Sequence, residues 1–216
     1  MKSVPELDGE ITKAVADRLS IIEALLPKLE EEVLALQESS KSRKTKTNVF
    51  DLVTEADLYS EKIITSAIQK HFLKDTIVAE EGTNHDLPNP ESFTWVIDPI
   101  DGTVNFANSL HHWGISVGIV TQNTPVGGIV SAPALNLRFR AIKGQGSTKN
   151  GTQIRVSDKS KLSEGVIVTG FPYDRAMRAE PLSKAIANFL KVAGGVRRYG
   201  AAALDFCSIA PFQLSI

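Results

Sequence analysis

Asp98-Pro99-Ile100-Asp101-Gly102-Thr103 lies between an apolar, strand-like run and a turn that contains Gly and Asn. Pro99 fixes its own φ and disfavours the helical region for Asp98, so Asp98 and Asp101 form a rigid bracket of carboxylate oxygens. Mg²⁺ prefers hard oxygen ligands of this kind. Gly102 allows the backbone to turn closely past a ligand, and the Thr103 hydroxyl and nearby amides can face an anion at a helix start. The stretch therefore predicts a site for a divalent metal and a phosphate group.

The sequence from Thr76 onward has a pattern typical of β-strands. Short apolar runs recur there between Gly, Pro and Asn, as the strands of one large sheet would. Asn150-Gly151 is a strong signal for a tight hairpin. The runs that we predict to be strands are residues 76–79, 94–98, 114–121, 127–132, 137–142 and 166–169.

Helical spacing of apolar residues marks both ends of the chain. Ser3-Val4-Pro5-Glu6 has the pattern of a capping box and predicts a long amphipathic helix, which Pro27 kinks or splits. Thr54 is the predicted N-cap of a second helix that runs to about His71. The polar run between these helices is predicted to be a loop, at 39–48. Near the end of the chain we expect a helix, a short strand and an Ala-rich helix, at 181–192, 196–199 and 200–210.

Composition narrows the class of protein. The chain has 216 residues, 42% of them hydrophobic, so it can bury a substantial core. Lys and Arg number 24 against 25 Asp and Glu, which gives no basic field for a nucleic acid or an anionic membrane. The single cysteine, Cys207, lies in an apolar helix and is interpreted as core packing. With no apolar N-terminal run, we expect a cytoplasmic protein that acts on small molecules.

The acidic pair Glu80-Glu81 strengthens the prediction of a metal site. Alone, the Asp-x-x-Asp spacing is compatible with a structural turn, and Glu80-Glu81 with an exposed one. Glu80-Glu81 adds a third carboxylate to the two Asp side chains, and three or more carboxylates around a phosphate suggest two or more Mg²⁺ ions and in-line hydrolysis of a phosphate ester. His111-His112 could be ligands, but no third nitrogen or sulfur ligand stands at zinc spacing, so a structural role is favoured.

Several motifs, in this order, resemble the inositol monophosphatases, a family of Mg²⁺-dependent, Li⁺-sensitive phosphatases. The resemblance spans nearly the whole chain up to Ala210. It rests on five stretches: Asp51-Leu52-Val53-Thr54-Glu55-Ala56-Asp57, Glu80-Glu81-Gly82, Trp95 through Phe106, Thr169-Gly170-Phe171-Pro172-Tyr173, and Arg198 through Asp205.

The resemblance implies a layered α/β (α+β) sandwich, with N-terminal helices packed on a large, mostly antiparallel sheet and an incomplete second α/β half. The implied units are 1–165 with the metal site, 166–210 as a partial second subdomain, and 211–216 as a tail outside the family pattern. The implied reaction is hydrolysis of myo-inositol monophosphate to inositol and phosphate. The implied assembly is a homodimer, without nucleic acid or membrane partners.

The resemblance also implies a set of metal ligands. Glu80, Asp98 and the carbonyl of Ile100 would hold the first Mg²⁺ ion. Asp98 would bridge to a second ion that Asp101 also binds. Family members use two or three such ions.

Other residues take implied roles around the substrate. Asp57 and Thr103 would orient and deprotonate the attacking water. Gly102 and Thr103 would present amides to the phosphate, and Ala202 would lie beside the sugar alcohol. Lys46 would add positive charge near the site.

The family pattern stops after Ala210. Members of the family continue with a substrate-binding Glu and a Trp-Asp-x-Ala-Ala-Gly motif, whereas this chain ends in Pro211-Phe212-Gln213-Leu214-Ser215-Ile216. Ala201 also replaces a usual Ser or Thr. We therefore expect an incomplete second metal site and strongly reduced or absent activity. The alternatives are a phosphatase for another phosphomonoester, such as a sugar phosphate or histidinol phosphate, and a non-catalytic chain that binds metal or pairs with a full-length subunit.

Overall fold

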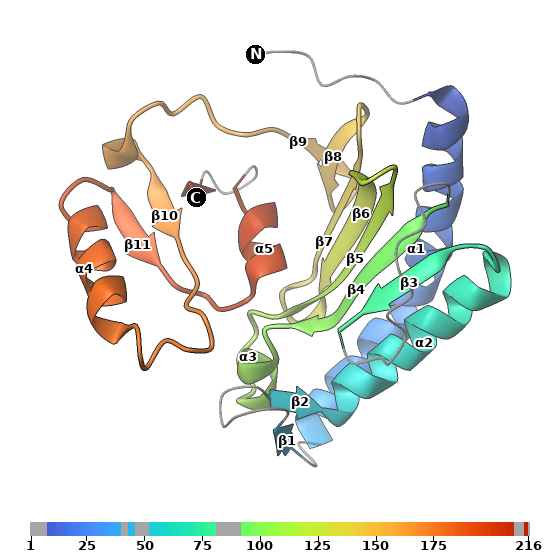
Figure 1. The fold of residues 1–216 in the computed structure, drawn as a ribbon, viewed down its shortest axis with the longest axis horizontal. Coiled ribbons are helices and arrows are strands. Elements are labelled where there is room, and N and C mark those ends of the chain that lie inside the picture. The colour runs from blue at the N-terminus through green and yellow to red at the C-terminus, as the bar shows by residue number, and fades with distance from the viewer. Residues whose placement is uncertain (1–7, 40–42, 46–51, 81–91, 210–213, 216) are drawn as a thin grey trace.

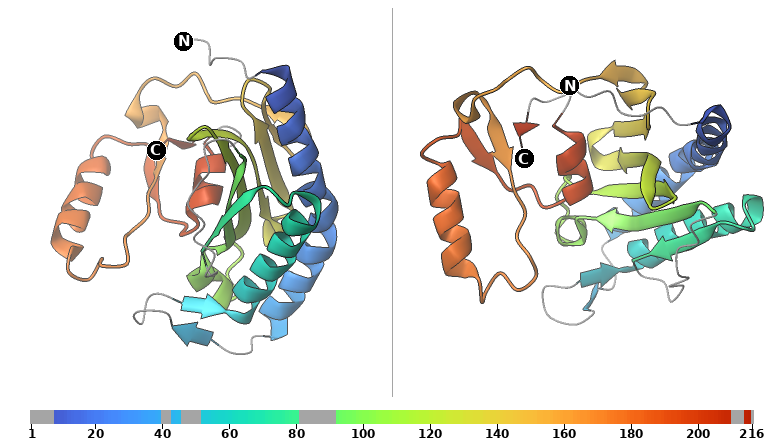
Figure 2. Two further views of the ribbon diagram at one scale, coloured as in Figure 1. Left: turned by 45° about the vertical axis from the view of Figure 1, so that its right-hand side comes forward. Right: turned by 45° about the horizontal axis from the view of Figure 1, so that its top comes forward.

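The computed structural model describes residues 8–39, 43–45, 52–80, 92–209 and 214–215. Its layers are visible in Figure 1, where α1 (Gly9–Ser39) and α2 (Glu55–His71) cover one face of a large sheet. The short helix α5 (Ala202–Cys207) lies on the other side of that sheet, and a small second sheet and α4 (Ala179–Phe189) follow beyond it (Figures 1 and 2). The fold is therefore the layered α/β sandwich that the sequence predicts.

The large sheet has seven strands in the order β3-β4-β5-β6-β7-β8-β9. Only β3 and β4 are parallel, and every other neighbouring pair is antiparallel. Asn150 and Gly151 both have positive φ, 48° and 78°, and join β8 to β9 as the predicted hairpin. The strands are β3 (Thr76–Ala79), β4 (Thr94–Asp101), β5 (Gly114–Thr121), β6 (Thr124–Ala132), β7 (Leu137–Ile142), β8 (Gly146–Lys149) and β9 (Thr152–Ile154).

The second sheet corrects the strand assignment made from the apolar runs. β10 (Val166–Val168) pairs in parallel with β11 (Gly195–Arg197) and with β12 (Leu214–Ser215), so assigning 166–169 to the one large sheet is wrong. The chain between β10 and β11 includes α4, and such crossovers join parallel strands. An apolar run shows that a strand is buried, but it does not show which sheet the strand joins. The division into 1–165, 166–210 and 211–216 remains a prediction.

The core between α1, α2 and the sheet is apolar and continuous. Leu19, Ile22 and Leu29 of α1 are completely buried and pack in one cluster with Trp95 and Ile119 of the sheet. Pro27 lies inside this single helix, so the predicted split does not occur. Proline removes only one hydrogen-bond donor, and the buried residues on both sides of it keep the helix on the sheet. The predicted capping box at Ser3 lies outside the described residues.

The segment between α1 and α2 differs in part from the predicted loop. β1 (Arg43–Thr45) pairs antiparallel with β2 (Leu52–Thr54), which no hydrophobic alternation in this polar run had indicated. Thr54 then caps α2 as predicted. Two short 3₁₀ turns, Pro133–Leu135 and Leu162–Glu164, complete the elements outside the site. No helix in the described ranges is both long and apolar enough to cross a membrane.

Candidate active site

The carboxylates of the opening hexapeptide stand at the end of β4. The strand continues to Asp101, three residues beyond the predicted end, and its pairing with β5 shifts register between Asp98 and Asp101. Pro99 lies in this irregular stretch and cannot donate to the ladder. The interruption therefore leaves both acidic side chains at the carboxyl end of β4, after the apolar run, as the sequence pattern indicates.

Gly102 makes the turn from β4 into α3 (Thr103–Ala107). Its φ is +91°, in the left-handed region, and it is the N-cap of α3. A Cβ at this position would lie 3.1 Å from the Cβ of Ala201 and 3.2 Å from the carbonyl oxygens of Gly200 and His112. Both the dihedral angle and the space require glycine here. The turn brings Thr103 back toward the first turn of α2.

Asp57 and Thr103 meet at that point. The Thr103 hydroxyl lies 3.3 Å from Oδ1 of Asp57 and 3.0 Å from the carbonyl oxygen of Ile100. The other oxygen of Asp57 accepts hydrogen bonds from the backbone N–H, at 2.8 Å, and from the hydroxyl of Thr54. Burial raises the pKa of Asp57, while the hydrogen bonds from Thr54 and Thr103 oppose that rise. The capping box thus fixes the carboxylate that faces Thr103.

Asp98 is the most strongly perturbed acid of the site. Burial, followed by the negative charges of Glu80 and Asp101, raises its pKa to about 8. Its Oδ1 atom is buried and has no hydrogen-bond partner among the described residues. A buried carboxylate oxygen without a donor is costly, so this atom calls for a cation or a proton.

Asp101 has a different environment from Asp98. Its two oxygens accept the backbone N–H groups of Ala202, at 3.0 Å, and Ala203, at 2.6 Å. Burial raises the pKa of Asp101, and these amide hydrogen bonds oppose the rise. The predicted site residues Asp101 and Ala202 are therefore in direct contact, although 101 positions separate them.

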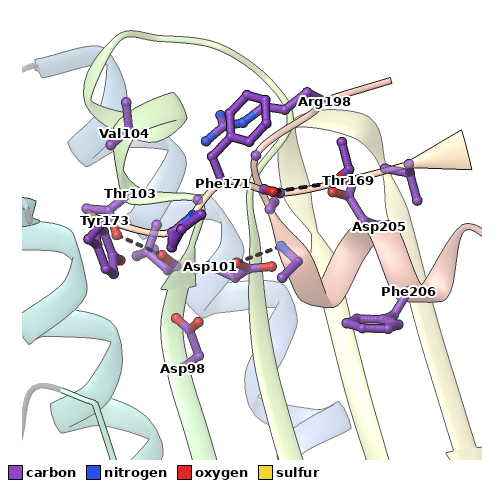
Figure 3. A pocket seen from close by; sticks show the side chains of 18 of the residues that line it. Asp98, Asp101, Thr103, Val104, Thr169, Phe171, Tyr173, Arg198, Asp205 and Phe206 are labelled. Atoms are coloured by element: carbon purple, nitrogen blue, oxygen red, sulfur yellow. Dashed lines mark hydrogen bonds between the residues drawn. The ribbon is translucent and has the colours of Figure 1, made fainter. Parts of the chain in front are cut away.

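A pocket of about 690 Å³ unites these groups with the second half of the chain. Figure 3 shows Asp98, Asp101 and Thr103 on one side and Phe171 and Arg198 on another. Arg198 lies over the Phe171 ring, with its Cζ 5.5 Å from the ring centroid. Several predicted site residues line the pocket together: Glu80, Asp98, Ile100, Asp101, Gly102, Thr103 and Ala202. Lys46 lies outside the described residues.

Apart from Ala202, the second-half wall of the pocket had no role in the sequence-based set. Phe171 and Arg198 belong to stretches that carry the family resemblance, and this position in the motifs was the available signal. Asp205 also lines the pocket and binds Nε2 of His112 across 93 positions, which no local pattern reveals. The structural role favoured for His112 agrees with this contact.

Cys207 has the expected packing role. It is partly buried against the small apolar cluster of Ala201 and Leu204. Burial, followed by the charge of Asp101, raises the pKa of its thiol to about 12. The thiol stays protonated near neutral pH and is a poor nucleophile there.

The donor set fits a hard cation, although the described residues do not form a finished cage. No group of three His, Cys, Asp or Glu side chains in the described ranges is arranged to hold a metal by itself. The unpartnered Oδ1 of Asp98, the adjacent charges of Glu80 and Asp101, and the nearby Ile100 carbonyl are nevertheless oxygen ligands of the kind that Mg²⁺ prefers.

The sequence of this chain is similar to those of known proteins. The model described as "Inositol monophosphatase family" matches residues 12–216. An inositol-1-monophosphatase from Synechocystis sp. is 37% identical over 180 residues, which cover 83% of this chain and 62% of that protein. A Nus factor SuhB from Pasteurella multocida is 36% identical over 166 residues, 74% of this chain and 60% of the relative.

A solved structure extends the likeness to three dimensions. The Thermotoga maritima IMPase matches with a TM-score of 0.80 and 34% identity, over 89% of this chain and 72% of that one. The matched part of this chain spans about 60% of the length of the two curated relatives. The family model over residues 12–216, the sequence relatives and the solved structure all point to one family, and the chain therefore belongs to the inositol monophosphatase family.

Proposed function

We propose that the pocket hydrolyses a small phosphomonoester, with myo-inositol monophosphate as the substrate, and that Mg²⁺ is the cofactor. The observation that carries the proposal is the buried Asp98 carboxylate, whose Oδ1 has no hydrogen-bond partner among the described residues and whose neighbours Glu80 and Asp101 are also acidic. The family is generally metal-dependent, and a cation would balance this concentration of negative charge.

The ligands would come from one edge of the large sheet. Glu80, Asp98 and the Ile100 carbonyl would hold the first ion, and Asp98 and Asp101 a second one. Bound there, Mg²⁺ would supply Lewis-acid stabilisation of the charge that develops on the phosphate oxygens. The amide hydrogen bonds already made by Asp101 fix the direction of its remaining lone pairs, so its orientation depends on α5.

Asp57 and Thr103 would handle the proton of the attacking water. The Thr103 hydroxyl can donate to Oδ1 of Asp57, and its oxygen then accepts from a water in the pocket. As the water gives its proton to the Thr103 oxygen, the Thr103 proton would pass to the Asp57 carboxylate, which becomes neutral and leaves hydroxide as the nucleophile. Burial, which raises the pKa of Asp57, favours this protonated form, and the hydrogen bonds from Thr54 keep the carboxyl group in place. Gly102 and Thr103 would contribute backbone N–H groups to the phosphate.

The alcohol part of the substrate would lie toward α5 and the second sheet. Ala202, Asp205 and Arg198 line this side of the pocket and offer a backbone group, a carboxylate and a guanidinium. Hydroxyl groups of a sugar alcohol can donate to the first two and accept from the third. This polar wall suits a polyol better than an apolar alcohol.

Release of inorganic phosphate tests the proposal. The chain is incubated with myo-inositol 1-phosphate and excess Mg²⁺, with parallel reactions in a chelator and with the Asp98→Asn variant. We expect any release to require both Mg²⁺ and Asp98 and to be far slower than that of a full-length family member, because the second metal site is incomplete. A glucose phosphate and histidinol phosphate serve as competing substrates, and faster release from either would replace the inositol assignment. Mg²⁺ binding by the folded chain without release from any of the three would favour the non-catalytic alternative.

A further inference from the structure

A contact between distant parts of the chain lies just behind the pocket. Nε2 of His112, in the segment before β5, is 3.0 Å from Oδ1 of Asp205 in α5, and the two side chains are only 22% and 10% exposed. The His112 ring also stacks on Tyr199, with 4.6 Å between the ring centroids and 27° between the planes. Because a carboxylate only accepts hydrogen bonds, Nε2 of His112 is the donor. One imidazole therefore holds both the residue before the Gly200 turn and the helix that follows it.

Asn105 reinforces the same junction from α3. Its side-chain Nδ2 donates to the carbonyl oxygens of His112, at 2.6 Å, and Tyr199, at 2.7 Å. Asn105 is buried and lies two residues after Thr103 in the same short helix. The junction is thus built on the turn that carries the proposed water-activating hydroxyl.

The junction also sets where α5 begins. Asp205 lies in the first turn of α5, and its backbone N–H bonds to the carbonyl of Ala201. The N–H groups of Ala202 and Ala203 point at the carboxylate of Asp101. A rotation of this six-residue helix would move both amides away from Asp101. Leu204 packs α5 against Ala132 and Phe139 of the large sheet, and the contact between Asp205 and His112 adds a directional polar anchor to the first half of the chain.

We propose that His112 is a positioning residue for the pocket: through Asp205 it fixes α5, and through the Ala202 and Ala203 amides it sets the direction of the Asp101 carboxylate. This inference rests on the proposed function for its catalytic consequence, whereas its structural consequence can be measured without any substrate. The ring of His112 does not line the pocket itself, so its effect on the reaction is indirect.

The first measurement is amide hydrogen exchange at Ala202 and Ala203 in the full chain. His112→Ala removes the donor, His112→Gln keeps a side-chain Nε2–H that can reach Asp205, and His111→Ala is a control at the exposed neighbouring histidine. We expect exchange at the two amides to become at least about tenfold faster in His112→Ala, relative to the amide of Ile129 in β6, and to stay near wild type in the other two variants.

Catalysis gives the second measurement. Displacing a ligand by around 1 Å can cost about 10²-fold in rate, so we expect kcat for phosphate release to fall at least about tenfold in His112→Ala and to be restored in His112→Gln. The double variant Asp205→Ala, His112→Ala should be no slower than the slower of the two single variants, because each substitution removes the same contact.

The outcomes separate the two proposals. Unchanged exchange at Ala202 and Ala203 in His112→Ala would overturn the positioning role, as would equal acceleration at Ile129, which would mean general loss of stability. Failure of His112→Gln to restore protection would also count against it. If the wild type releases no phosphate but exchange responds selectively, the proposed function fails and the positioning of α5 by His112 stands.

Discussion

Thr103 Oγ1 lies 3.3 Å from Oδ1 of Asp57, although 46 positions separate the two residues. The contact joins the first turn of α2 to the first turn of α3, and Gly102 makes it possible by reversing the chain at the end of β4. The Asp57 carboxylate is held from its other side by Thr54. A hydroxyl that is oriented by a fixed, buried carboxylate is an arrangement suited to moving a proton.

Removal of the hydroxyl should therefore slow the reaction more than it affects the fold. We expect Thr103→Val to lower kcat for phosphate release about 10²-fold or more, because Asp57 loses its link to the water. Thr103→Ser keeps the hydroxyl and should stay within about tenfold of wild type on the same scale. Steady-state kinetics with myo-inositol 1-phosphate measure both, and equal rates for the two variants would contradict the assigned role.

Asp98 should make the metal-free protein less stable as the pH rises. Its pKa is raised to about 8 in the folded chain, so between about pH 4 and pH 8 the folded state holds a proton that the unfolded state has released. The free energy of unfolding therefore decreases with rising pH across this window and levels off above it. Denaturant unfolding in a chelator at several pH values measures the slope.

Replacing Asp98 with Asn should remove much of that slope. The neutral amide needs no proton to remain buried, and its N–H can donate to the nearby Glu80, so we expect Asp98→Asn to stabilise the metal-free chain at pH 8 by about 2 kcal/mol. Mg²⁺ should raise the Tm of the wild type and leave that of the variant nearly unchanged. If wild-type and variant chains had the same stability at pH 8 in a chelator, the buried Asp98 carboxyl group would not destabilise the metal-free chain at that pH.

The sequence predicted many of the helices and strands correctly because the signals for them are local. Thr54 is followed by the carboxylate of Asp57 three residues later, Asn150-Gly151 needs positive φ, and alternating or continuous apolar runs mark the strands. All of these patterns act within one turn of helix or one strand. The order of strands 3 to 9 also follows the chain, so neighbours in sequence become neighbours in the sheet.

The features that sequence reasoning missed depend on distant partners. β10 belongs to the second sheet because it pairs in parallel with β11, which follows only after α4. β1 forms because β2 offers it an edge, not because its own polar residues favour a strand. His112 and Asp205 form a pair across 93 positions. The family motifs located the pocket, but they did not identify this junction.

Gly102 should tolerate no side chain. We expect Gly102→Ala to destabilise the chain by about 2 kcal/mol or more, since it combines a left-handed φ with close approach to Ala201 and two carbonyl oxygens. Gly151 has a positive φ, but a Cβ there would have no neighbour within 4 Å, and Gly170 has neither constraint. The loss of stability on substitution by Ala should therefore decrease from Gly102 to Gly151 to Gly170. Denaturant unfolding of the three variants checks the order, and an equal cost at Gly102 and Gly151 would mean that packing against Ala201 contributes nothing.

Arg18, Asp75 and Trp95 form a polar cluster that ties α1 to the edge of the large sheet. Arg18 donates from Nε and Nη2 to the two oxygens of Asp75, both at 2.8 Å, and its guanidinium also lies over Phe72 and Phe93. The indole N–H of Trp95 donates to the same carboxylate at 2.8 Å. The Asp75 side chain is only 4% exposed, so its loss would leave the Arg18 charge and the Trp95 N–H without an acceptor.

Asp75→Ala should therefore be strongly destabilising, because it removes one partner of a buried ion pair. We expect a loss of about 3 to 5 kcal/mol in the free energy of unfolding, because breaking a buried ion pair leaves its partner uncompensated. Asp174→Ala is the matched control: Asp174 pairs with Arg178 at 3.8 Å, both side chains are exposed, and such pairs contribute about 0 to 1 kcal/mol. A double cycle with Arg18→Met tests the pairing itself, because Asp75→Ala should cost far less once the buried positive charge is gone. If the cost of Asp75→Ala were the same in both backgrounds, Trp95 and not Arg18 would be the partner that requires the carboxylate.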